Sequence, residues 1–331
     1  MNYRNLGSTG LNVSEIGFGT WGIGGGSYGL ADDQESKKAL RTAFDKGVTF
    51  YDTADLYGDG HAEELLGEVF SGSERDKIII ATKGGTLPHT TFTMPQNFSV
   101  MHVTNALEAS LRRLKTDYID VYLLHSPRLD DIRSSRTLLD TLKMFKKNGR
   151  IKTFGISART PKDAVIAIDE FGFPIVEINF NMIDHRALDN GLFERAQKEN
   201  IGIIVRTPLT FGYLTGKLKG NEDFEKSDHR NNWPKEQLKR WAKAPELFSF
   251  LFENIDQTPA QAALRFCLAF DSVSTVIPGM MRVSEVLENT RASEMSLLTQ
   301  DQVRRIRDIY KSNEDIFYDR IFQKVKPNGN N

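Results

Sequence analysis

Eight short runs rich in branched and aromatic apolar residues recur along the chain, and helical patterns separate most of them. Parallel strands need a crossover of about a dozen residues or more, and such crossovers are right-handed. This alternation therefore predicts a parallel sheet with helices packed around it. The predicted strands are residues 15–19, 48–52, 77–83, 118–125, 151–157, 175–180, 201–207 and 273–279.

The segments between these runs supply the helices. Acidic residues open the first of them and Gly47 closes it, while Thr-Pro opens two others as cap and first-turn residue. Eight strand–helix units in 331 residues fit an α/β fold, a closed (β/α)8 TIM barrel. The clearest predicted helices are residues 32–47, 99–115, 134–149, 160–172 and 258–270.

The domain organisation follows from the same pass along the chain. No low-complexity linker divides residues 1–331, so we predict a single barrel domain. Two strand-like runs around Ser8-Thr9-Gly10 predict an N-terminal hairpin. Long irregular segments, 84–98 and 208–257, both follow strands, on the side where barrel enzymes keep their active sites.

Composition excludes several classes of function. The 43 Lys and Arg residues nearly balance 44 Asp and Glu residues, which argues against binding nucleic acid. The single cysteine, Cys267, lies in an apolar helical pattern, where a packed thiol is expected, and it allows no intrachain disulfide. The chain has neither a signal-like apolar segment nor 18 consecutive apolar residues. We therefore expect a cytoplasmic protein without a membrane partner; the sequence does not indicate its oligomeric state.

Two motifs resemble binding sites without the context that such sites require. Residues 17–22, GFGTWG, match the glycine pattern of dinucleotide-binding folds, but glycine-rich sequence follows where a helix would have to open. His61 and the acids after it have no second histidine at helical spacing, so a solvated helix start is the simpler interpretation. We expect no metal site.

Four polar residues stand at the ends of neighbouring predicted strands. Asp52 ends the second strand, Tyr57 follows in its loop, Lys83 ends the third strand and His125 ends the fourth. Each alone has an ordinary interpretation, such as a surface charge or a helix cap. Because the carboxyl ends of barrel strands converge, we expect all four to meet at one mouth.

The expected chemistry of this cluster is proton donation to an oxygen. A buried lysine beside a phenol should pull the tyrosine pKa down from about 10. Asp52 would compensate the Lys83 charge, and a neutral His125 would donate a hydrogen bond to a carbonyl oxygen. Tyr57 would then act as the proton donor while another group delivers a hydride.

The sequence resembles the aldo-keto reductases, including their potassium-channel β-subunit branch, over nearly its whole length. The similar blocks are LGSTGLNVSEIGFGTW, FYDTADLYGDGHAEELLG, IATK, LKTDYIDVYLLH, GRIKTFGIS, RTPLTFGYLTGK and TVIPGMMRVSEVLEN, in the family's order. The resemblance places the family's catalytic tetrad on Asp52, Tyr57, Lys83 and His125. It implies hydride transfer from NADP(H), with NAD(H) also possible, to a small-molecule carbonyl substrate.

The resemblance also implies a cofactor lying in an extended pose along the barrel mouth. Trp21 and its neighbours would meet the nicotinamide, residues after Arg206 would follow the pyrophosphate, and Arg282 would meet the adenosine phosphate. The implied cofactor residues are Gly19, Thr20, Trp21, Asp52, Ser157, Glu177, Arg206, Thr207, Pro208, Leu209, Gly212, Leu214, Gly216, Lys217, Pro278, Gly279, Met280, Arg282, Glu285, Glu288 and Asn289.

Three positions depart from the pattern of the family. Ala158 stands where the family commonly has Asn, and Glu177 stands where it commonly has Gln, so the clamp on the nicotinamide carboxamide differs. Glu285 stands where many relatives carry Arg or Gln near the 2′-phosphate. It could repel that phosphate or pair with Arg282 one turn away.

Two functions from different classes fit this resemblance. The first is an NADPH-dependent reductase of aldehydes, ketones or sugar-like carbonyls. The second is a redox-sensing regulatory binding protein of the channel β-subunit type, with slow chemistry. The implied substrate-binding residues are Trp21, Tyr28, Tyr57 and His125, and loop 84–98, with Phe92 and Met94, would complete an open pocket.

Overall fold

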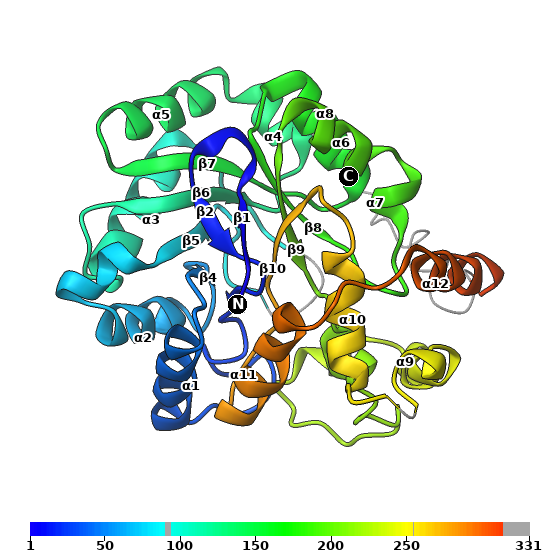
Figure 1. Cartoon of the computed structure of the whole chain (residues 1–331). Coiled ribbons are helices and arrows are strands. Elements are labelled where there is room, and N and C mark those ends of the chain that lie inside the picture. The colour runs from blue at the N-terminus through cyan, green and yellow to red at the C-terminus, as the bar shows by residue number, and fades with distance from the viewer. Residues whose placement is uncertain (90–93, 254, 314–331) are drawn as a thin grey trace.

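The structure is a computed structural model that describes residues 1–89, 94–253 and 255–313. Its centre is an eight-stranded parallel sheet in which each strand pairs with the next one along the chain (Figure 1). The strands are β3 (Phe18–Gly19), β4 (Phe50–Asp52), β5 (Ile79–Gly84), β6 (Ile119–His125), β7 (Ile151–Ser157), β8 (Ile175–Asn179), β9 (Gly202–Arg206) and β10 (Val273–Val276).

The two edges of this sheet meet. Parallel bridges join Ile16 to Val276 and Gly19 to Gly279. A Cβ atom at Gly19 would lie 2.9 Å from the Ile277 carbonyl oxygen, so only glycine permits this close approach of two backbones. The predicted (β/α)8 barrel is confirmed.

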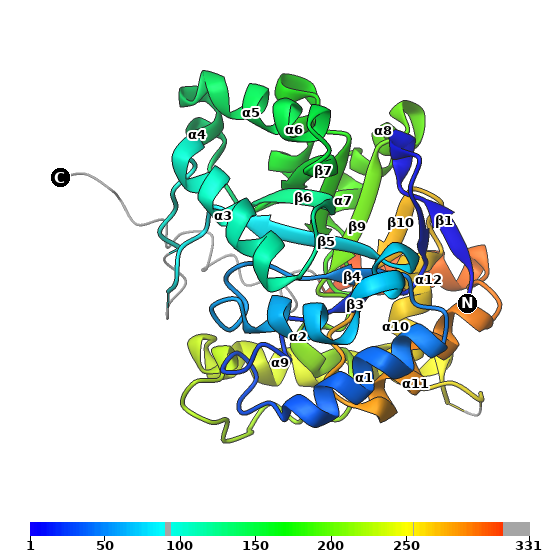
Figure 2. The same ribbon diagram turned by 90° about the vertical axis from the view of Figure 1, so that its left-hand side faces the viewer.

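Helices cover the outside of the barrel (Figures 1 and 2). Thr160 and Thr258, the two predicted Thr-Pro caps, accept hydrogen bonds from the backbone N–H groups of Asp163 and Gln261. The helices are α1 (Asp33–Asp45), α2 (His61–Val69), α3 (Val100–Arg113), α4 (Leu129–Ser134), α5 (Arg136–Lys147), α6 (Pro161–Phe171), α7 (Arg186–Asp189), α8 (Leu192–Glu199), α9 (Lys235–Leu247), α10 (Pro259–Leu268), α11 (Val283–Thr290) and α12 (Gln300–Ser312).

The predicted N-terminal hairpin closes one end of the barrel. Strand β1 (Tyr3–Asn5) pairs antiparallel with β2 (Asn12–Ser14). Leu6 and Val13 from the hairpin join barrel residues such as Phe50 in one buried apolar cluster. Figure 2 shows the hairpin at one end, with the arrow of β5 pointing away from it. The carboxyl ends of the strands therefore lie at the other end, and they form the mouth of the barrel.

The irregular segments differ in part from expectation. The predicted first barrel strand shrinks to Phe18–Gly19, because residues before it make only a single bridge. The segment 208–257, expected to be irregular, contains the helix α9, on which Leu238 and Trp241 are buried. Phe92 of the loop after β5 lies outside the described residues.

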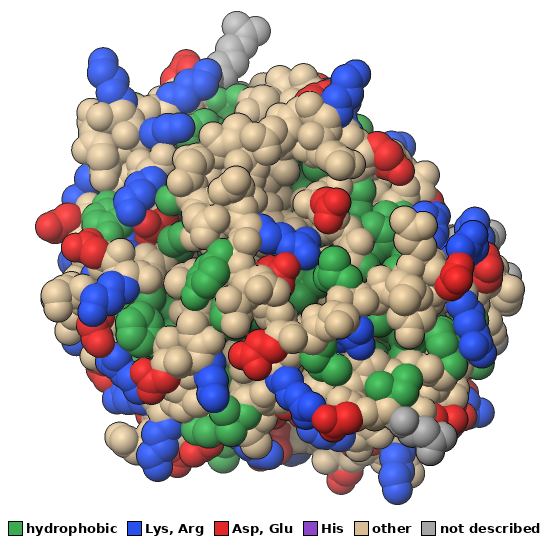
Figure 3. Space-filling model, in the orientation of Figure 1, with side chains coloured by type: hydrophobic (Ala, Val, Ile, Leu, Met, Phe, Trp, Pro, Cys, Tyr) green, Lys and Arg blue, Asp and Glu red, His purple; other side chains and the backbone are tan. Residues whose placement is uncertain are grey.

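The surface agrees with the balanced composition. On the face shown in Figure 3, Lys and Arg side chains are interspersed with Asp and Glu side chains. None of the described helices combines the length and the apolar character that crossing a membrane requires. Nor do the described residues contain a group of three or more His, Cys, Asp and Glu side chains arranged to hold a metal ion.

Candidate active site

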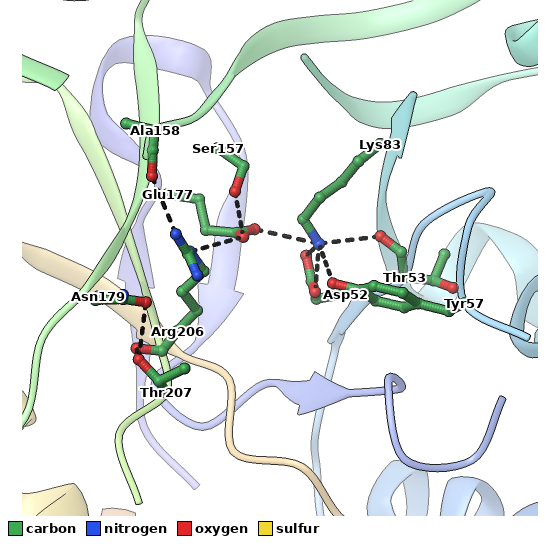
Figure 4. A network of polar contacts seen from close by, with 10 residues as sticks. All are labelled: Asp52, Thr53, Tyr57, Lys83, Ser157, Ala158, Glu177, Asn179, Arg206 and Thr207. Carbon is green, nitrogen blue, oxygen red and sulfur yellow. Dashed lines mark hydrogen bonds and ion pairs between the residues drawn. The ribbon is translucent and has the colours of Figure 1, made fainter. Parts of the chain in front are cut away.

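The barrel brings Asp52, Tyr57, Lys83 and His125 together at its mouth. Lys83 Nζ lies 2.6 Å from both carboxylate oxygens of Asp52 and 3.4 Å from the Tyr57 hydroxyl (Figure 4). The ring of His125 packs edge-on against Tyr57, with 6.0 Å between their centroids. These contacts arise because β4, β5 and β6 are adjacent and parallel, so their last residues share one edge.

Lys83 is fully buried and paired with two carboxyl groups. Besides Asp52, the Glu177 carboxylate on β8 lies 3.3 Å from Lys83 Nζ. Burial alone would lower the pKa of Lys83, but the two acids outweigh it and raise that pKa above its ordinary value. Lys83 is therefore an ammonium, and neither acid is a buried charge without a counterion.

The predicted pKa of the tyrosine was wrong in direction. Burial raises the pKa of Tyr57 to about 12, and Lys83 lowers it only in part. The carboxyl groups of Asp52 and Glu177 add to the upward shift. The expectation took account of the Lys83 ammonium but not of the burial of Tyr57 or of the second acid, Glu177. Tyr57 is thus a neutral phenol at neutral pH, which is the form that donates a proton.

His125 has the protonation state that was expected of it. Burial, together with the cations Lys83 and Arg206, lowers the pKa of His125 well below its ordinary value. The ring is therefore a neutral imidazole, and among the described residues its Nδ1 atom has no hydrogen-bond partner. A neutral imidazole beside a phenol can hydrogen-bond a carbonyl oxygen without carrying charge into the site.

The ends of β7, β8 and β9 form the second half of the mouth. The Ser157 hydroxyl donates to Glu177 Oε1 over 2.8 Å. The guanidinium of Arg206 donates to the Ala158 carbonyl over 3.0 Å, and its Nε lies 3.7 Å from Glu177 Oε1. Glu177, expected as a carboxamide ligand, thus lies between Lys83 and Arg206 and links the two halves (Figure 4).

Aromatic side chains flank the tetrad. Trp21 lies 6.3 Å from Tyr57 and 5.2 Å from Tyr28 between ring centroids. His229, which the sequence analysis missed, packs on Trp21 at 4.4 Å and on Tyr28 at 4.7 Å. It lies within the long segment after β9, and a lone histidine in a loop carries no signal of its place in space.

The loop after β9 has an unusual backbone. Thr207, Thr210 and Phe211 are non-glycine residues with left-handed φ, and Gly212 follows at φ 95°. Such conformations cost free energy and cluster at ligand-binding segments. At its far end Lys217 forms an ion pair with Glu288 of α11, over 2.8 Å. The loop and the helix, both expected to contact a dinucleotide, therefore lie side by side.

The start of α11 does not show the second alternative considered for Glu285, pairing with Arg282. Its carboxylate accepts a hydrogen bond from the Met281 N–H over 2.7 Å, instead of pairing with Arg282. Glu35 of α1, which the sequence analysis did not single out, accepts from the Val283 N–H over 3.1 Å. Two carboxylates thus lie at a helix N-terminus where Arg282 is exposed.

The residues present fit a nicotinamide dinucleotide. At the mouth, the described residues leave four buried polar atoms without hydrogen-bond partners: Nδ1 of His125, Nε of Arg206, Oε2 of Glu177 and Oγ1 of Thr20. Buried polar atoms normally have partners, so unpaired ones at a functional mouth indicate a missing ligand.

The (β/α)8 barrel, with Asp, Tyr, Lys and His side chains at its mouth, has the features expected of a carbonyl-reducing oxidoreductase. The model of the aldo/keto reductase family matches residues 15–311, and the chain belongs to that family. It is 32% identical to the aldo-keto reductase YhdN of Bacillus subtilis (strain 168) over 251 residues, 73% of this chain and 72% of that protein. The resemblance seen in the sequence is confirmed.

Other similar proteins are a plant protein and a bacterial structure. The chain is 29% identical to a probable voltage-gated potassium channel subunit beta of Arabidopsis thaliana, covering 94% of this chain and 97% of that protein. The glycerol dehydrogenase AKR11B4 of Gluconobacter oxydans superposes with a TM-score of 0.78 at 25% identity, covering 94% of this chain and 95% of that chain.

Proposed function

We propose that the protein is an NADP(H)-dependent reductase of small aldehydes and ketones, with Tyr57 as the proton donor. The observation that carries the proposal is the contact of Lys83 Nζ with both Asp52 and the Tyr57 hydroxyl, beside a neutral His125. Family membership supports the reaction class. The similarity to a glycerol dehydrogenase supports small polyhydroxylated substrates.

When bound, the reduced nicotinamide supplies the hydride that reaches the carbonyl carbon. The chain's own residues handle the oxygen. His125 orients the carbonyl oxygen, and Tyr57 gives its hydroxyl proton to that oxygen as the C–O double bond becomes a single bond. Lys83 stabilises the phenolate left behind, and Asp52 holds Lys83 in place. Solvent returns the proton to Tyr57, so the alcohol has gained two electrons and two hydrogens.

The cofactor residues inferred from the family stay part of this proposal. Trp21, Ser157, Glu177 and Arg206 surround the expected nicotinamide position, and Arg282 offers a guanidinium to a 2′-phosphate. Glu35 and Glu285 at the same helix start oppose that phosphate, which supports only a modest preference for NADP(H) over NAD(H). We further propose a cytoplasmic location and one barrel domain over residues 1–331.

Steady-state consumption of NADPH with a panel of aldehydes, ketones and hydroxyaldehydes tests the proposal. We expect many turnovers per active site. The similarity to a channel β-subunit favours the second candidate function, a redox-sensing binding protein, which predicts a single slow turnover with every carbonyl in the panel. That result would replace the enzyme by the sensor. No oxidation of bound NADPH by any carbonyl would contradict both.

A further inference from the structure

The ammonium of Lys83 has more acceptors than donors. It carries three N–H groups. Lys83 Nζ donates hydrogen bonds to the Asp52 carboxylate over 2.6 Å and to the Thr53 carbonyl over 3.0 Å. The Tyr57 hydroxyl accepts a long hydrogen bond from Lys83 Nζ over 3.4 Å. The Glu177 carboxylate is an ion-pair partner at 3.3 Å whose Oε2 accepts no hydrogen bond from the described residues, so it competes with Tyr57 for the position of the ammonium. Because charged acceptors attract an ammonium more strongly than a neutral hydroxyl does, Glu177 weakens the hold of Lys83 on Tyr57.

Glu177 is fixed in this position. Its side chain is only 1% exposed, and the Ser157 hydroxyl on the neighbouring strand β7 donates to Oε1. The carboxylate therefore cannot turn out to solvent, as a surface acid would. Its second oxygen is directed at Lys83, across the mouth from its own strand (Figure 4).

The charged side chains that share the mouth with Glu177 come from three other strands. Asp52 on β4 and Lys83 on β5 lie on one side, Arg206 on β9 lies on the other, and His125 on β6 is neutral. Two cations and two carboxyl groups thus share the mouth with one phenol. Apart from burial, Lys83 lowers the pKa of Tyr57, whereas Asp52 and Glu177 both raise it.

We propose that Glu177 is a positioning residue that competes with Tyr57 for the Lys83 ammonium and so keeps the phenol protonated far into the alkaline range. The consequence for catalysis, which rests on the proposed function, is that carbonyl reduction persists at high pH. In each turnover the O–H bond of Tyr57 breaks as the alcohol O–H bond forms, so only the protonated enzyme is competent.

The direct test is an ultraviolet absorbance titration of tyrosinate in the cofactor-free protein. The Tyr57 contribution is obtained by subtracting the titration of each protein's own Tyr57→Phe partner. Glu177→Gln keeps the size of the side chain and an oxygen for Ser157 but removes the charge. We expect this substitution to lower the pKa of Tyr57 by about one to three units, a tenfold or larger rise in its ionisation constant.

Glu15→Gln is the matched control. Glu15 is also buried, accepts from a serine hydroxyl, Ser293, and pairs with a cation, Arg4, but it lies outside the mouth. It should leave the Tyr57 titration unchanged. Glu177→Asp retains the charge and should keep the pKa near the wild-type value. An unchanged pKa in Glu177→Gln, or an equal drop in Glu15→Gln, would overturn the proposal.

A second variant covers the case in which Glu177→Gln does not fold. Ser157→Ala removes only the hydroxyl that fixes Oε1 and frees Glu177 to turn toward Arg206. We expect a smaller fall in the same pKa, and no fall would count against the role of Glu177.

The pH profile of kcat/KM for carbonyl reduction extends the test to turnover. We expect the alkaline limb in Glu177→Gln to move to lower pH by the same amount as in the titration. A shifted titration in a protein that reduces no carbonyl would keep the role of Glu177 and reject the proposed function. A shifted titration with an unmoved limb in an active enzyme would remove Tyr57 as the proton donor.

Discussion

The two ends of the barrel bury opposite kinds of side chain. At the hairpin end, Leu6 and Val13 pack with Phe50 and other barrel side chains in an apolar cluster. At the mouth, Lys83, Asp52 and Glu177 are as deeply buried but charged or titratable. Apolar packing stabilises a fold, whereas a buried ion pair contributes little net stability. Removing one partner of such a pair strongly destabilises the protein, because the other charge is left buried alone. The hairpin end thus serves stability and the mouth serves chemistry.

Lys83→Met should have the largest effect, because it damages both properties. It leaves Asp52 and Glu177 buried without their shared cation, which should cost about 3–5 kcal/mol of unfolding free energy. Reduction at neutral pH should be lost, and the apparent pKa of the proton donor should rise. Denaturant unfolding and the pH–rate profile measure these effects. Lys152→Met, an exposed strand lysine paired with Asp120, is the control. A pH–rate profile that does not move would remove Lys83 from the mechanism.

Tyr57→Phe should separate chemistry from stability at the mouth. Removing the general acid should lower kcat by about 10²- to 10⁴-fold, while cofactor affinity and unfolding temperature stay close to wild type. Tyr51→Phe removes another buried hydroxyl, one that donates to the Leu40 carbonyl, and should leave kcat unchanged. If Tyr57→Phe kept more than half of kcat with chemistry rate-limiting, the assigned role would be wrong.

Leu6→Ala should give the opposite result at the hairpin end. The fully buried Leu6 side chain packs near Gly202 beneath the barrel, so truncation should cost about 2–5 kcal/mol of unfolding free energy. Because the cavity forms far from Lys83, kcat/KM of the folded protein should not change. Equal losses of activity and stability would show that the two ends are not independent.

The same contrast explains what the sequence could predict. The barrel and the meeting of Asp52, Lys83 and His125 follow from strand order, because adjacent parallel strands end at one edge. The pKa of Tyr57 could not be predicted in this way, because it depends on how deeply the phenol is buried and on Glu177, whose strand lies four strands away around the barrel.

Contacts made across the closed barrel were equally invisible. Glu35 reaches the start of α11 because α1 and α11 pack together, and His229 reaches Trp21 through an irregular segment. Periodicity fixes the faces of elements, but no pattern in the sequence gives the path of a long loop.

The smallest expected effect concerns the rim of the mouth, at the start of α11. Arg282 is exposed there, with Glu285 bonded to the Met281 N–H and Glu35 to the Val283 N–H. A guanidinium at a helix N-terminus attracts a 2′-phosphate, while the two carboxylates repel it. We therefore expect NADPH to bind more tightly than NADH by a modest factor.

Arg282→Ala should reduce that preference by roughly tenfold or less, the range of a hydrogen bond to a charged group, and leave NADH affinity within a few-fold. Glu285→Gln should increase the preference, because it removes a negative charge from the same helix start. Arg291→Ala removes an exposed arginine from the other end of α11 and should change neither affinity. Fluorescence titration with both cofactors measures these ratios. Equal affinity of the wild type for NADPH and NADH would contradict the assignment of Arg282 to the phosphate.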